Sequence, residues 1–141
     1  MKFVFVFFAF FTSAIANVGN ANASSFDGCY QLLDTGVMYP AVCISGTEEE
    51  GISGAGARLA VFNTNTTELA ACLISTALKI SDKEFIFEID GQKELVLNNF
   101  NTDYGVLKGD ATVGRTKIKF VKLSTESTQR LMESAEKGNC I

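Results

Sequence analysis

The 141-residue sequence contains no His and no Trp, and its single Pro is Pro40. The absence of His removes the side chain most often used as a general base, together with every imidazole-based metal site. The net charge is −4, and it becomes −5 when the N-terminal Lys2 is set aside. We therefore expect no nucleic-acid partner and no anionic membrane surface held by bulk charge.

Long hydrophobic runs are also missing, because the apolar run 3–11 is far shorter than the ~20 residues of a membrane-spanning helix. Lys2, this run and the small-residue frame 14–16 follow the order of a secretory signal peptide. We expect residues 1–16 to be the signal peptide, with 1–23 as the alternative, and 17–25 to be a flexible tail. We therefore expect a secreted or periplasmic protein with no transmembrane anchor and no lipid-attachment Cys.

Four Cys in a chain of this size fit two disulfides formed in an oxidising compartment. Spacing alone allows three pairings. Cys29 and Cys43 are symmetric about Gly36, so a hairpin turning there would place them opposite each other. That pairing leaves Cys72 for Cys140. A metal site is disfavoured, since there is no C-x-x-C motif.

About eight short apolar or alternating runs follow Phe26, as is typical of antiparallel strands. Asp90-Gly91 predicts a tight hairpin between two runs, and Gly114 predicts another. Pro40 indicates that the second strand lies or begins at a sheet edge. The expected strands are 26–33, 39–45, 57–63, 70–80, 84–89, 93–98, 104–113 and 115–123.

One helix is expected at about 125–137, with Ser124 or Thr125 as N-cap and Gly138 at its end. Its apolar face carries Leu131, Met132 and Ala135. A helix of this length is marginal on its own, so we expect it to lie against the sheet.

Residues 26–141 are expected to form one all-β domain, an eight-stranded antiparallel up-and-down barrel with the short C-terminal helix. The barrel is favoured over a two-sheet β-sandwich because the order of hairpins contains no long crossover. This architecture resembles that of lipocalins. The resemblance is one of architecture only, because Gly28-Cys29-Tyr30 stands where that family usually has Gly-x-Trp and the chain is shorter.

Large apolar residues at alternating positions are predicted to fill the barrel interior. These are Tyr30, Leu32, Val42, Ile44, Leu59, Val61, Phe85, Phe87, Leu95, Leu97, Leu107, Ile118 and Phe120. Smaller residues on or near the same strands would leave room for a cavity, namely Gly28, Ala41, Ala60, Gly109 and Ala111. The residues predicted to contact a small apolar or amphipathic ligand are Tyr30, Phe85, Phe87, Leu97 and Phe120.

The segment 46–56 combines four Gly with three consecutive Glu and is predicted to be an acidic loop. Loops on a rigid β scaffold often carry binding residues. If the protein acts on a partner protein, we expect the contacts to be made by Glu48, Glu49, Glu50 and Ile52.

Catalytic patterns are weak. No G-x-S-x-G motif occurs, and Glu84, Glu88 and Asp90 alternate with apolar residues in a way that assigns them to a solvent-facing surface. A basic stripe of Arg115, Lys117 and Lys119 is expected to face carboxylates on neighbouring strands, and the alternative is that it binds an anion or an acidic partner.

The sequence thus predicts a non-enzymatic exported protein without cofactor or metal, which binds a small apolar or amphipathic ligand inside a β-barrel. The alternative is a secreted inhibitor or adhesion module that contacts a partner protein through loop 46–56.

Overall fold

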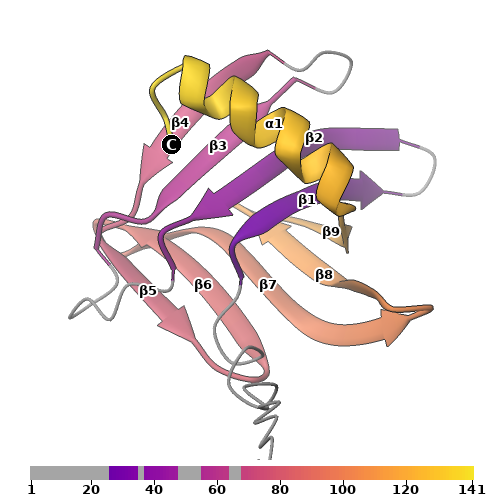
Figure 1. Cartoon of the computed structure of the whole chain (residues 1–141). Helices are drawn as coiled ribbons and strands as arrows, with labels where there is room; N and C mark the ends of the chain where they lie inside the picture. The colour runs from indigo at the N-terminus through magenta and orange to yellow at the C-terminus, as the bar shows by residue number, and fades with distance from the viewer. Residues whose placement is uncertain (1–25, 35–36, 48–54, 64–67) are drawn as a thin grey trace, which may run out of the picture.

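The computed structural model describes residues 26–34, 37–47, 55–63 and 68–141 and consists of antiparallel strands with one helix (Figure 1). The expected signal peptide and the expected tail 17–25 lie outside these residues. The strands are β1 (Gly28–Asp34), β2 (Val37–Ser45), β3 (Arg58–Phe62), β4 (Leu69–Ile74), β5 (Ala77–Ile80), β6 (Glu84–Ile89), β7 (Gln92–Asp103), β8 (Val106–Val113) and β9 (Thr116–Lys122). The helix α1 spans Thr125–Lys137.

The strands form one sheet in the order β4-β3-β2-β1-β9-β8-β7-β6-β5. Each strand pairs with its neighbour in the chain, except that β1 and β9 also pair and β4 does not pair with β5. The predicted up-and-down all-β order is therefore confirmed. The sheet curls into a half-barrel whose two free edges are β4 and β5, and its β1–β4 half faces its β5–β8 half (Figure 1).

The expected strand 70–80 is divided into β4 and β5, which makes nine strands instead of eight. Ser75 is buried at the division, and its hydroxyl accepts a hydrogen bond of 3.0 Å from the Ala57 amide. The next amide, that of Thr76, donates instead to the Glu88 carbonyl oxygen at 2.9 Å. The chain thus leaves β3 and joins β6 at this corner, because the hydrogen bonds of the adjacent residues Ser75 and Thr76 go to opposite halves of the sheet.

Both predicted hairpins are present. Asp90 and Gly91 have φ values of 50° and 80°, the left-handed pair required by a two-residue type I′ turn. Gly114 has φ 60° in the turn between β8 and β9. A further tight turn at Tyr104-Gly105 was not anticipated. Consequently β7 runs five residues past the expected end at 98, and β8 begins at Val106 rather than at 104.

Pro40 was expected to mark an edge, but β2 lies inside the sheet between β1 and β3. Gln31 pairs with Ala41 whereas Leu33 pairs with Met38, so β2 carries one extra residue at this point. The pairing of β2 with β3 begins only at Ala41. Pro40 therefore lies in a bulge of the β1–β2 pairing and beyond the end of the β2–β3 pairing. No amide donor is needed at such a position, and this explains how an interior strand accommodates proline.

The half-barrel is covered on two faces. Its inner face holds a core that includes Tyr30, Phe85, Phe87, Leu97 and Phe120, and of the residues predicted for the interior only Val61 and Leu107 are partly exposed. Helix α1 lies across the outer face of β1 and β2 (Figure 1). The buried residues of the cluster between the helix and the sheet are Cys29, Ala41, Cys43, Ala60, Phe62, Leu131, Ala135 and Cys140. Residues 41–44 of β2 are all buried, so both faces of the strand are covered there, in agreement with their continuous apolar sequence.

The predicted helix and both disulfides are confirmed. Ser124 is the N-cap, its side chain accepting from the Ser127 amide, and α1 ends before Gly138, although the left-handed residue is Asn139. Cys29 and Cys43 pair across β1 and β2 and form one disulfide. The second disulfide joins Cys72 on β4 to Cys140 beyond the helix.

Gly109 on β8 provides a close approach that no other residue allows. A Cβ atom placed there would lie 2.5 Å from the Asn98 carbonyl oxygen and 2.8 Å from the Phe120 ring. We predict that Gly109→Ala lowers the free energy of unfolding by about 1–3 kcal/mol, as overpacking does in other cores. Urea denaturation would measure this loss. Gly105→Ala is a control for the loss of glycine without a clash, since a Cβ atom at that position would meet nothing within 4 Å. Any loss of stability in this control would come from the positive φ alone. If the structure of the Gly109→Ala variant shows no displaced neighbours and the two variants lose equal stability, the packing argument is contradicted.

Candidate ligand-binding cavity

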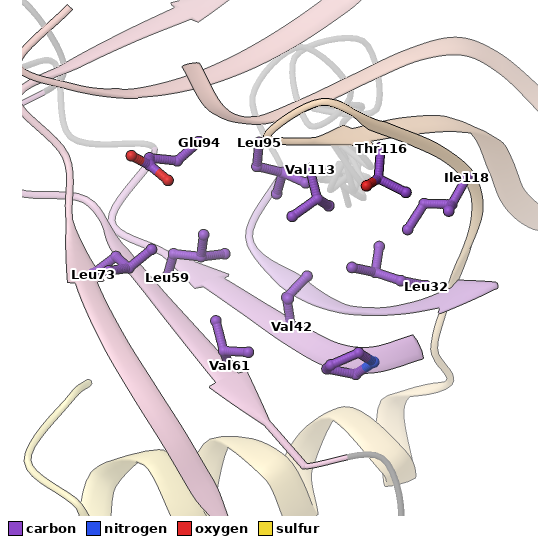
Figure 2. Close-up of a pocket in the computed structure, with 11 residues that line it drawn as sticks. Leu32, Val42, Leu59, Val61, Leu73, Glu94, Leu95, Val113, Thr116 and Ile118 are labelled. Carbon is purple, nitrogen blue, oxygen red and sulfur yellow. The ribbon is translucent and has the colours of Figure 1, made fainter. Parts of the chain in front are cut away.

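A cavity of about 190 Å³ lies inside the half-barrel, between its two halves. It is partly open to solvent. The strands β1 to β4 contribute Leu32, Pro40, Val42, Leu59, Val61 and Leu73, and the strands β7 to β9 contribute Glu94, Leu95, Val113, Thr116 and Ile118 (Figure 2). The curling of the sheet is what brings these two sets together.

The walls are almost entirely aliphatic. Val42, Leu59 and Leu95 are buried, whereas Val113 is 39% exposed, and Thr116 is exposed as well. The exposed pair flanks the turn between β8 and β9, and we place the mouth of the cavity there. Among the eleven lining residues, Thr116 supplies a hydroxyl and Glu94 the single charged group. Figure 2 shows the Glu94 carboxylate on the side where Leu59 and Leu73 lie.

A β-bulge places Glu94 on the inner face of the sheet. Phe87 pairs with Leu95, whereas the next residue, Glu88, pairs with Lys93, so Glu94 is the extra residue of β7. A bulge redirects a side chain from the position that strict alternation would assign to it. Glu94 and Leu95 are consecutive, and yet both line the cavity.

Glu94 was not among the residues predicted from the sequence, although a signal for it exists. The two-residue Asp90-Gly91 turn sets Ile89 opposite Gln92. Continued without interruption, that register would put Leu95 and Leu97 on the outer face of the sheet. The apolar residues of β6 require these two leucines inside. One extra residue resolves the conflict, and it falls between the turn and Leu95.

The five residues predicted to contact a ligand lie elsewhere. Tyr30, Phe85, Phe87, Leu97 and Phe120 are all fully buried in the packed core, and none of them lines the cavity. The Tyr30 and Phe120 rings meet edge to face, with centroids 5.7 Å apart. The small residues Ala41 and Ala60 face helix α1 instead of the interior. The aromatic residues are therefore packed within the core, whereas the cavity is lined by aliphatic side chains of the same core.

Tyr30 is held as a neutral hydrogen-bond donor. Its hydroxyl donates to the Phe26 carbonyl oxygen at 2.8 Å. Burial raises the pKa of Tyr30 far above its ordinary value, and the nearby negative charge of Asp27 raises it further. The phenol is a structural tie between the start of the described chain and the core.

The acidic loop is described only at its two ends. The predicted contact residues Glu48, Glu49, Glu50 and Ile52 lie outside the described residues. The Asp27 carboxylate accepts hydrogen bonds from the amides of Gly46 and Thr47, at 3.2 and 3.0 Å. This carboxylate anchors the start of the loop to the beginning of β1.

Several other described carboxylates have cationic or amide partners. Glu88, expected to face solvent, is only 8% exposed and lies 3.1 Å from Lys79 Nζ on the neighbouring strand. Lys119 pairs with Asp110 on β8, as the predicted facing of the basic stripe requires. Hydrogen bonds from Lys119 and Asn99 lower the pKa of Asp110.

A polar groove of about 360 Å³ surrounds the Asp110–Lys119 pair. It is larger than the aliphatic cavity, and its lining is mostly polar. Asp110 and Lys119 satisfy each other, and small-molecule sites are usually lined mainly by apolar side chains, so the aliphatic cavity is the stronger candidate site.

In the described ranges, no group of three or more His, Cys, Asp and Glu side chains is arranged to hold a metal ion. Nor does any helix in that part of the chain have the length and apolar character needed to cross a membrane. The two disulfides are consistent with a non-cytoplasmic compartment. No family model matches the sequence, and neither the curated proteins nor the solved structures include a match to the chain.

Proposed function

We propose that the protein is an exported, non-catalytic binding protein that holds a small amphipathic ligand in the cavity of the half-barrel. The observation that carries this proposal is an aliphatic cavity, partly open to solvent, with one carboxylate and one hydroxyl among its lining groups. An apolar concave site with few polar groups is the usual form of a small-molecule site.

Cavity size limits the ligand. A dry protein cavity of about 150 Å³ lined by aliphatic and aromatic side chains is known to take up benzene. The cavity of 190 Å³ is slightly larger. The enclosed part of the ligand is therefore about one ring or a short alkyl chain, and a larger ligand would extend through the mouth near Thr116.

Export is part of the same proposal. The N-terminal pattern of Lys2, an apolar run and a small-residue frame supports a signal peptide, and two disulfides support an oxidising destination. The rival role, in which loop 46–56 contacts a partner protein, stays a prediction that deletion of residues 47–55 would test.

Titration with benzyl alcohol, followed by NMR, tests the cavity as a binding site. We expect saturable binding with Kd on the order of 0.01–1 mM, since so few ligand atoms contribute. Val61→Phe, which fills the cavity from β3, is expected to weaken binding at least about tenfold because it occupies the ligand's volume. The matched control is Val106→Phe on the exposed surface of β8. Equal affinity in the two variants, or no binding to the unmodified protein, would overturn the proposal.

A further inference from the structure

We infer that the ligand is an amphipathic amine whose protonated nitrogen binds the Glu94 carboxylate. This inference rests on the proposed function and names the ligand class of the same cavity. Its starting point is the combination of an aliphatic wall with one redirected carboxylate.

The Glu94 carboxylate is available to a ligand. Within the described part of the chain, Glu94 forms no hydrogen bond and no ion pair, whereas Glu88 on the adjoining strand is paired with Lys79. A half-buried carboxylate beside apolar walls gives up part of its hydration and gains little in return. A cation placed against it would restore that loss, and charge-assisted hydrogen bonds are stronger than neutral ones.

The same geometry selects against other head groups. A ligand carboxylate would lie beside Glu94 with no positive group among the lining residues to offset the repulsion. An alcohol would form a neutral-to-charged hydrogen bond without the attraction between opposite charges. A metal ion is a poor fit, because one carboxylate and one hydroxyl provide too few ligands for Ca²⁺ or Zn²⁺.

Backbone geometry holds the carboxylate in place. Glu94 is the extra residue of a bulge whose neighbours Leu95 and Phe87 are both buried, so its Cα position is defined by the core. A group held on a strand is positioned more accurately than one on a loop. We therefore expect the preference for amines to be a property of the folded site rather than of the negative net charge.

Three probes of nearly equal size test the inference, namely benzylamine, benzyl alcohol and benzoate, titrated at pH 7 and followed by NMR. We expect benzylamine to bind at least about tenfold more tightly than benzyl alcohol, and benzoate to bind most weakly. Glu94→Gln retains the shape and removes the charge; it should bring benzylamine to within about twofold of benzyl alcohol. The affinity for benzyl alcohol should fall much less than that for benzylamine, because the glutamine amide oxygen still accepts a hydrogen bond. Glu136→Gln, an exposed change on α1 with the same loss of charge, should retain the preference.

The outcomes separate this inference from the proposed function. If all three probes fail to bind, both are overturned. If benzyl alcohol binds in the cavity but benzylamine binds no more tightly, the ligand class is wrong and the proposed function stands. If Glu94→Gln and Glu136→Gln reduce benzylamine binding equally, the preference comes from net charge, and the role of Glu94 is overturned. Circular dichroism of each variant confirms that it folds, and Glu94→Ala provides a second removal of the carboxylate.

Discussion

Replacing Phe120 with Ala is expected to lower the free energy of unfolding by about 3–5 kcal/mol. Phe120 is fully buried on β9, its ring meets those of Tyr30 and Phe100, and it covers the open backbone of Gly109. Truncation would remove all of these contacts at once and leave a void in a core with little freedom to collapse. Chemical denaturation of the unmodified protein and the variant measures the difference.

Tyr104→Ala is the matched control, because it removes an aromatic side chain that is 99% exposed at the tip of the β7–β8 hairpin. We expect it to change stability by less than about 0.5 kcal/mol. A similar small loss for Phe120→Ala would show that the aromatic region is not the stabilising core. Retained affinity for benzyl alcohol in a folded Phe120→Ala protein would agree with the absence of Phe120 from the cavity lining.

Removing the Cys72–Cys140 disulfide by a double Ala substitution is expected to cost about 4 kcal/mol. The disulfide closes a loop of 68 residues, and in the chain-entropy model a long loop restricts the unfolded chain strongly. It also joins the end of the chain beyond α1 to β4, a free edge of the sheet. Urea denaturation without reductant measures the loss.

Hydrogen exchange provides a second readout for this variant. Amides of α1 should lose protection more than those of β6 and β7, because the helix would then be held by the packing of its apolar side chains on the sheet, chiefly Leu131 and Ala135. The Cys29–Cys43 disulfide, which closes a loop of 14 residues, should still form. A loss below about 1 kcal/mol, with unchanged exchange in α1, would contradict the expected role of this disulfide.

Much of the local structure could be predicted because it depends on short-range rules. Asp90-Gly91 requires a tight turn, and the stripe containing Leu131 predicts an amphipathic helix whose bounds the structure reproduces. The symmetry of Cys29 and Cys43 about Gly36 correctly predicts their pairing, although a bulge shifts the register nearer the turn. Such features need information from residues close in the sequence.

Other features depend on which segments meet in space. The division at Ser75 could not be predicted, because its cause is a pair of hydrogen bonds to Ala57 and Glu88 from opposite halves of the sheet. The interior place of β2 was missed for a related reason. A proline restricts its own ladder position, and only the tertiary pairing shows that the neighbouring strand ends before Pro40.

The candidate site shows the same division. The order of amino acids alone establishes which residues are apolar and alternate, and hence that an all-β core with two disulfides forms. It could not reveal which of these residues pack against each other and which leave a space, since aromatic and aliphatic positions alternate alike. Curling of the assembled sheet settles this, so that aromatic rings fill one region and smaller side chains leave a cavity. The place of Glu94 is likewise a tertiary outcome, because a turn and a hydrophobic pattern that disagree by one residue can be reconciled only by a bulge in the assembled sheet.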